Sequence, residues 1–222
     1  MMSKKFIPVA LVLIAASFFL AFKSQGRTDT DDNPKSRHAR ILRNVGVLLE
    51  EGHFSPRKID DAFSKTVLKK FTEDLDDEKD ILLASDIESF KKYENKIDDE
   101  IHGSELESFY AINEVYLKRL NEASKIYQSI LAKPFDFTVD ESVQLEADKN
   151  NFPKDEAERI DTWRKRLKFY VLDKYVAAQD EREKNKDKKD YKIKADSTLE
   201  REAREATLKQ IDRYFATKKN RE

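Results

Sequence analysis

Apolar side chains recur every three to five residues along most of the chain, a spacing that places them on one face of an α-helix. Between residues 52 and 90 this apolar stripe consists of Ile59, Phe63, Leu68, Phe71 and Leu75. Ser55-Pro56 precedes the stripe, and a capping serine followed by proline at the first helical position is typical of a helix start. Asp76-Asp77 then indicates a turn, and Ile81-Leu82-Leu83 is a short apolar run.

The same periodicity predicts five other helices, at residues 36–51, 86–103 and 104–132, and beginning near residues 154 and 197. Ser85, Ser104 and Ser197 each precede a glutamate by three residues, a capping box that marks a helix N-terminus. The residues expected to face inward in these helices are Ile41, Leu42, Val45, Leu48, Leu49, Ile87, Phe90, Ile97, Ile101, Leu106, Phe109, Tyr110, Leu117, Leu120, Ile126, Tyr127, Ile130, Ile160, Trp163, Leu167, Tyr170, Val171, Tyr175, Leu199, Ala203, Ala206, Ile211 and Phe215.

Two segments interrupt the helical pattern. Residues 135–153 are expected to cross between helices, with Thr138 and Glu141 capping a short helix inside the crossing. Residues 180–194 are almost entirely charged and are expected to form a solvated loop. No Asn-Gly hairpin and no sustained alternation indicates a strand. The fold class predicted is therefore all-α, a single irregular multi-helix domain.

Composition narrows the functional classes. Charged residues make up 39% of the chain, and 43 Lys and Arg face 44 Asp and Glu, which favours solvated helix faces over a nucleic-acid surface. The absence of cysteine excludes disulfides and thiol catalysis. No pattern indicates a cofactor.

The N-terminus predicts export. Lys4 and Lys5 precede an apolar run over residues 6–22, as in a secretory signal. Ser24-Gln25-Gly26 is the candidate cleavage site, and the alternative is an uncleaved inner-membrane anchor, for which 17 residues is the lower limit. We favour cleavage, which divides the chain into a leader at 1–26, a polar linker at 27–35 and a helical domain at 36–222. The domain is then expected in the periplasm.

Candidate catalytic and metal-binding groups have simpler structural explanations. Ser55 and Lys58 match the S-x-x-K spacing of some serine–lysine hydrolases, but no partner motif accompanies them and helix capping explains Ser55. The three histidines have no zinc-ligand spacing; they are His38, His53 and His102. The acidic clusters lack the alternating ligands and central glycine of a calcium loop; they are Asp60-Asp61, Asp76-Asp77 and Asp98-Asp99-Glu100. We therefore predict no catalytic, cofactor or metal residue.

One group of aromatic residues leaves two interpretations open. Phe109, Tyr110, Tyr116 and Tyr127 share a helical spacing that favours a core. Any that remain exposed would instead indicate a partner surface.

Several motifs together resemble the N-terminal helical domain of the tail-specific proteases, also called carboxy-terminal-processing serine peptidases. The matching segments are HFSPRKIDDAFS at 53–64, Leu75-Asp76 with Glu78-Lys79, SDIESF at 85–90, Tyr93 with Ile97-Asp98-Asp99, KPFDF at 133–137, FPKDE at 152–156 and WRKRL at 163–167. The resemblance covers roughly residues 37–219. Asp77 departs from the family, which often has proline there, and Ile81-Leu82 replaces a more aromatic pair.

The resemblance implies a serine peptidase whose nucleophile and lysine lie in a protease domain absent from this chain, preceded by a PDZ domain. The helical domain is then expected to restrict access of polypeptide substrates and, as in some relatives, to contact a helical-repeat adaptor. The uncapped helical tail at 212–222 favours a fragment of such an enzyme. The main alternative is a stand-alone periplasmic helical adaptor, and a membrane-anchored helical enzyme of other chemistry has least support.

Overall fold

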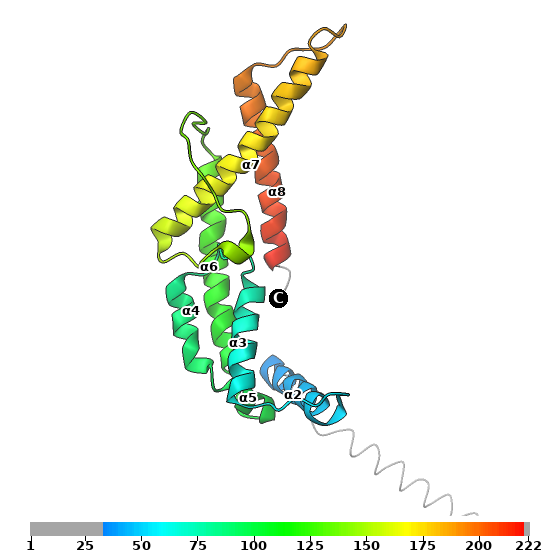
Figure 1. Ribbon diagram of the computed structural model, residues 1–222, viewed down its shortest axis with the longest axis vertical. Coiled ribbons are helices and arrows are strands. Elements are labelled where there is room, and N and C mark those ends of the chain that lie inside the picture. Colours follow the sequence, from blue (N-terminus) through cyan, green and yellow to red (C-terminus); the bar gives the residue numbers. More distant parts are fainter. Residues whose placement is uncertain (1–32, 220–222) are drawn as a thin grey trace, which may run out of the picture. The chain divides into compact units, whose positions relative to one another are not determined.

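The computed structural model describes residues 33–219, within which the chain forms seven α-helices and no strand, so the prediction of an all-α fold is confirmed (Figure 1). The described residues divide into two compact units, one formed by residues 33–57 with 100–106 and the other by 58–99 with 107–219. The predicted leader at 1–26 and most of the predicted linker lie outside the described residues. None of the helices within 33–219 is both long and apolar enough to cross a membrane.

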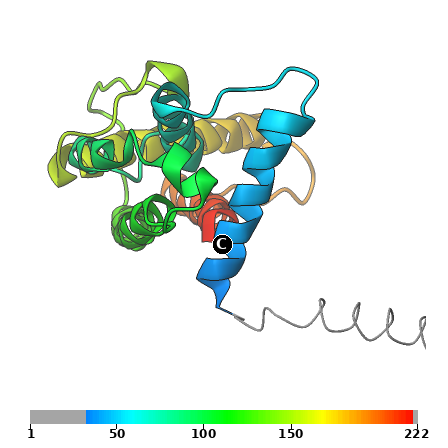
Figure 2. The same cartoon turned by 90° about the horizontal axis from the view of Figure 1, so that it is seen from below.

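The first unit is built on α2 (Pro34–Val47), which ends in a π turn over Leu48–Gly52 (Figure 2). The side chain of Asn33 caps α2 by accepting a hydrogen bond from the amide of Lys35 at 3.1 Å. Gly46 is the buried residue of α2, and a Cβ atom built there would lie 2.3 Å from Cγ2 of Ile101. Ile101 belongs to α5 (Ile97–His102). Because α2 packs through Gly46, the apolar face that was expected to point inward is exposed. The prediction that Ile41, Val45 and Leu48 are buried is therefore wrong.

Helix α3 (Asp61–Leu75) begins later than expected, so the prediction of a start at Ser55-Pro56 is wrong. Asp60 is the cap, because its carboxylate accepts hydrogen bonds from the amides of Ala62 and Phe63, both at 3.1 Å. The predicted apolar face is confirmed at Leu68, which is buried.

The helix expected at 86–103 is divided into α4 (Ala84–Phe90), a 3₁₀ turn (Lys91–Tyr93) and α5. The cap of α4 is Leu83, whose amide donates to Asp86 at 2.9 Å, so the capping box predicted at Ser85 is wrong. The new helix begins near Ile97 because Ser64 of α3 accepts a hydrogen bond from the first-turn amide of Asp98 at 2.7 Å.

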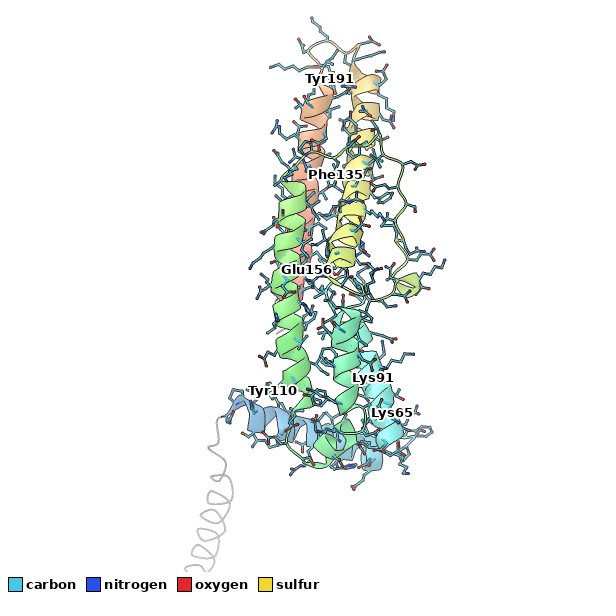
Figure 3. The ribbon with its side chains drawn as sticks, turned by 90° about the vertical axis from the view of Figure 1, so that its left-hand side faces the viewer. Lys65, Lys91, Tyr110, Phe135, Glu156 and Tyr191 are labelled. Carbon is cyan, nitrogen blue, oxygen red and sulfur yellow. The ribbon has the colours of Figure 1, made fainter. Side chains whose placement is uncertain are left out.

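Three long helices form the core of the second unit: α6 (Ser108–Leu131), α7 (Glu156–Asn185) and α8 (Asp196–Lys219). Figure 3 shows α7 and α8 as an antiparallel pair joined near Tyr191, with α6 ending before Phe135. Phe215 lies with its ring centroid 4.7 Å from that of Tyr127 and 5.7 Å from that of Trp163. The core prediction is confirmed where these helices meet, at Leu120, Tyr127, Trp163, Leu167, Val171, Leu199, Ala203, Ile211 and Phe215.

Several predicted boundaries around these helices are wrong. Glu107 precedes α6 in place of Ser104, and α8 begins one residue before Ser197. Helix α7 continues to Asn185 through the first six of the fifteen residues of the expected loop, and Arg182 there forms an ion pair with Asp196 at 2.6 Å.

The crossing segment contains no helix between Thr138 and Glu141; only a 3₁₀ turn forms in it, at Ala147–Lys149. Thr138 was expected to cap this helix. Its amide and its hydroxyl instead donate hydrogen bonds to the carboxylate of Asp136 and form a turn.

Among the other residues expected inside, Ile160 and Ala206 are exposed, because the buried contacts of α7 and α8 fall on Arg159 and Thr207 beside them. In the aromatic group, Tyr116 and Tyr127 are buried, as a core requires. Phe109 remains 39% exposed and contacts Phe71, with 6.2 Å between ring centroids.

Candidate functional site

Five of the eight residues in the connection between α3 and α4, residues 76–83, are buried although the segment lacks regular secondary structure. Asp76, at the end of α3, organises it. Its carboxylate accepts hydrogen bonds from the amides of Asp80 (3.2 Å), Ile81 (3.0 Å) and Leu82 (2.7 Å). These bonds satisfy backbone donors that would otherwise be buried without partners. The apolar side chains of Ile81 and Leu82 can therefore be fully enclosed.

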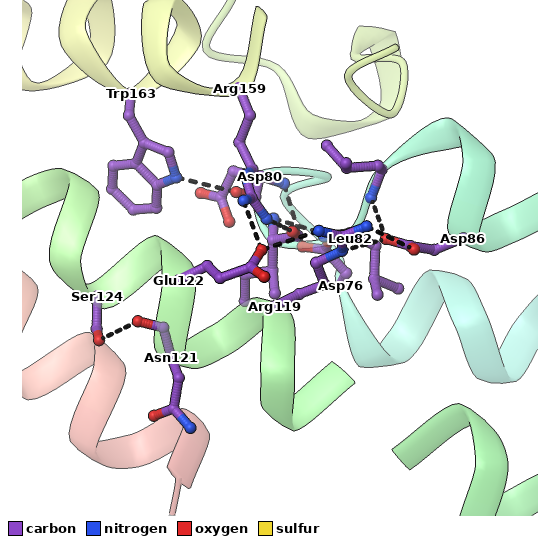
Figure 4. Close-up of polar contacts among 12 residues, drawn as sticks. Asp76, Asp80, Leu82, Asp86, Arg119, Asn121, Glu122, Ser124, Arg159 and Trp163 are labelled. Carbon is purple, nitrogen blue, oxygen red and sulfur yellow. Dashed lines mark hydrogen bonds and ion pairs between the residues drawn. The ribbon is translucent and has the colours of Figure 1, made fainter. Parts of the chain in front are cut away.

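Three side chains from one face of α7 hold the connection, at spacings of four and three residues. Figure 4 shows two of them, Arg159 and Trp163. Arg159 donates from Nη1 to the carbonyl of Ile81 at 2.8 Å, and Trp163 donates from Nε1 to the carbonyl of Asp80 at 2.9 Å. Arg166 donates from Nη1 to the Asp80 carboxylate at 2.5 Å. All three are at least 97% enclosed, so α7 supplies directional polar bonds to the connection from inside the core.

A chain of ion pairs continues from α7 through α6 to α4. Glu122 of α6 accepts from Arg159 at 2.8 Å and from Arg119 at 2.9 Å. Arg119 also binds Asp86 of α4 in a two-pronged contact, at 2.8 and 3.0 Å. Partial burial opposes ionisation of Glu122, yet the hydrogen bonds from the two arginines outweigh it and lower the pKa of this carboxyl. The network therefore links three helices through a continuous run of ion pairs.

The last turn of α8 reaches the same connection. Lys218, almost fully enclosed, forms an ion pair with Asp77 at 2.6 Å, and its ammonium lies 5.2 Å from the ring centroid of Tyr214. The hydrogen bonds from Lys218 prevail over the burial of Asp77 and lower the pKa of that carboxyl. Helices α3, α4, α6, α7 and α8 thus all contribute to one polar cluster around residues 76–86.

A second feature is a hollow of about 450 Å³ between the crossing segment and α7. Glu141 fixes the segment through ion pairs with Arg164 at 2.5 Å and with Lys168 at 2.8 Å. Hydrogen bonds from Arg164 and then Lys168 lower the pKa of Glu141 to about 2. Val139, Leu145 and Phe169 line the hollow and are 40–50% exposed, so its wall is partly apolar.

Comparison with known proteins identifies the family to which this helical domain belongs. A family model described as the tail specific protease N-terminal domain matches residues 45–221. The chain belongs to the tail-specific protease family. A curated relative, the tail-specific protease of Haemophilus influenzae, is 28% identical over 151 residues. The match covers 68% of this chain and 20% of the relative, so the chain spans about a fifth of that relative's length.

In this tail-specific protease domain, Ser55 lies in an exposed bend. Its amide donates to Nδ1 of His53 at 3.1 Å, and His53 Nδ1 lies 2.7 Å from the Ser55 carbonyl. Lys58 forms an ion pair with Asp60 at 3.1 Å. The serine and the lysine of the S-x-x-K match therefore have different partners.

The histidines and acidic clusters are likewise separated. His102 lies 3.2 Å from Glu50 within the first unit. Asp60 caps α3, Asp76 binds backbone amides and Asp98 accepts from the Ser64 hydroxyl at 2.6 Å. Within residues 33–219 no three His, Cys, Asp or Glu side chains converge in a way that could hold a metal ion.

Sequence reasoning did not predict the polar cluster, although the family motifs include Asp76, Asp86 and Arg166. Arg159 and Arg166 were indistinguishable from the surface arginines of a chain that is 39% charged. One available signal was their spacing around Trp163, since residues at positions 159, 163 and 166 share a helical face. That face was assigned to the core through Trp163 alone.

Proposed function

We propose that this chain is the non-catalytic helical scaffold of an exported tail-specific protease, with the peptidase chemistry carried by a protease domain outside residues 1–222. The observation that carries the proposal is that the buried charged side chains of the domain bind its own backbone and side chains. Arg159, Arg166 and Asp76 bind the backbone or side chains of the α3–α4 connection, and among residues 33–219 none of the three has a hydrogen bond with a serine or threonine hydroxyl. A serine nucleophile needs a general base within hydrogen-bonding reach. Arginine stays protonated and cannot serve as one, and the Asp76 carboxylate is engaged by three backbone amides.

The scaffold is proposed to restrict access of polypeptide substrates to the protease domain. Support comes from the way the network fixes helices of the second unit to each other, because a wall that controls access must resist deformation. A PDZ domain and the protease domain are its proposed covalent partners, and a helical-repeat adaptor its proposed docking partner. The periplasm is the proposed location, after cleavage of the leader near residue 26.

A cleavage assay tests the absence of chemistry. The full chain is incubated with an unfolded protein ending in apolar residues, and the products are followed by mass spectrometry. We expect no fragments above the buffer control, in wild type and in Ser55→Ala alike. Cleavage by the wild type that disappears in Ser55→Ala, but persists in the matched Ser104→Ala variant, would overturn the proposal.

The competing function is a stand-alone adaptor, which the partly apolar hollow beside α7 favours. The reading frame after the codon for Glu222 separates the two functions. PDZ and protease sequences in frame support the scaffold. A stop codon with no protease remnant downstream supports the adaptor.

A further inference from the structure

We propose that the buried carboxyl groups of Asp76 and Asp80 share a single proton, and that loss of this proton destabilises the α3–α4 connection by burying a further negative charge. The polar cluster would then act as a pH-sensitive joint in the scaffold. This goes beyond the proposed function, because a passive scaffold needs no titratable joint.

The two carboxyl groups are buried together but are unequally supported. Asp76 accepts three backbone amide bonds, which favour its ionised form. Asp80 has Arg166 on Oδ2, whereas its Oδ1 is buried without a hydrogen-bond partner among the described residues. The amide of Asp80 is itself a donor to Asp76, so the two groups lie within one short turn. Asp80 is therefore the better place for a shared proton.

The surrounding charges also favour keeping a proton. Carboxyl groups outnumber cations around Asp80. The titratable groups that interact electrostatically with Asp80 or its neighbours come from three elements. They are Asp76, Asp77 and Glu78 on the connection, Arg166 and Tyr170 on α7, and Tyr214 and Lys218 on α8. Arg166 and Lys218 are thus the two cations among these groups. Ionisation of Asp80 would place a fourth negative charge against them.

The direction of the pH effect follows from burial. Burial first, and the nearby Asp76 second, raise the pKa of Asp80 to about 7. Burial also raises the pKa of Asp76, so the proton belongs to the pair. The unfolded chain has ordinary aspartate pKa values near 3.8. Between pH 3.8 and about 7 the folded form keeps a proton that the unfolded chain has lost. The contribution of this proton to the stability of the fold is therefore full at low pH and is lost as the pH rises through about 7.

The single tryptophan of the chain provides the test, because Trp163 Nε1 is hydrogen-bonded to the carbonyl of Asp80. Tryptophan emission of the full chain is recorded from pH 5 to 9. We expect one reversible transition with a midpoint near pH 7 in the wild type. In Asp80→Asn, which keeps the shape but cannot lose a proton, the transition should be absent.

Two controls isolate the pair from other titrating groups. Asp77→Asn, on the same connection but more than half exposed, should keep the transition. A triple variant in which His38, His53 and His102 become glutamine should keep it too. A transition that survives in Asp80→Asn, or that vanishes in the histidine variant, would overturn the proposal.

Carboxyl ¹³C NMR of the wild type covers the case in which Asp80→Asn does not fold. The proposal predicts one aspartate carboxyl titrating between pH 6 and 8. If every aspartate titrates below pH 5, the shared proton does not exist and the proposal fails.

Discussion

At the scale of single residues, the same side-chain type has unrelated roles in this domain. Asp60 caps a helix from an exposed position, Asp76 binds a buried turn and Asp77 holds a lysine of α8. The sequence identified these residues only as members of the acidic clusters Asp60-Asp61 and Asp76-Asp77. It could not separate Asp76 from Asp77, because the difference between them is burial, which depends on helices more than 80 residues away.

The cap of α3 gives a prediction at this scale. Asp60→Ala removes the acceptor of two backbone amides and should lower the free energy of unfolding by about 1 kcal/mol. Ser55→Ala, at the cap expected from the sequence, should change it by less than about 0.5 kcal/mol. Urea denaturation of both variants measures the difference. Equal losses would mean that the helix start is not at Asp60.

At the scale of elements, the sequence predicted helix existence well and helix ends poorly. The apolar periodicity correctly placed the cores of α6, α7 and α8, because packing on one face imposes that period. The ends failed where a distant residue supplies the cap. Ser64 of α3, for example, accepts the bond at the start of α5. At α4 the contact is local, because Asp86 at the third helical position accepts from the Leu83 amide, but leucine at the cap gives no signal in the sequence.

The packing of α2 on α5 gives a prediction at the element scale. Alanine in place of glycine normally favours a helix interior by up to about 1 kcal/mol. At Gly46 the added methyl would overlap the side chain of Ile101, so Gly46→Ala should instead destabilise the first unit by about 1–3 kcal/mol. Hydrogen exchange of α2 amides measures the loss.

Gly52→Ala is the matched control, since a Cβ there would be in ordinary contact with Leu48 at 3.4 Å. Its α2 amides should be protected as in the wild type. Unchanged protection in Gly46→Ala would show that α2 does not pack through this glycine.

At the scale of the whole molecule, family and fold class were available from the sequence, whereas the polar cluster was not. Asp76 and Trp163 belong to motifs that lie far apart in the sequence, and only folding brings these two residues together around residues 76–86. The central claim is that buried charges in this tail-specific protease domain hold helices together and perform no chemistry. Arg159 joins α6, α7 and the connection, so it is the residue on which that claim depends most.

The most direct test is the free energy of unfolding of Arg159→Met, measured by urea denaturation beside Lys165→Met. Loss of Arg159 leaves the Ile81 carbonyl buried without its partner and removes one of the two arginines bound to Glu122, and should cost about 3–5 kcal/mol. Lys165 pairs with Asp161 at the surface of the same helix, and its loss should cost less than about 0.5 kcal/mol. Equal, small losses in both variants would contradict the account.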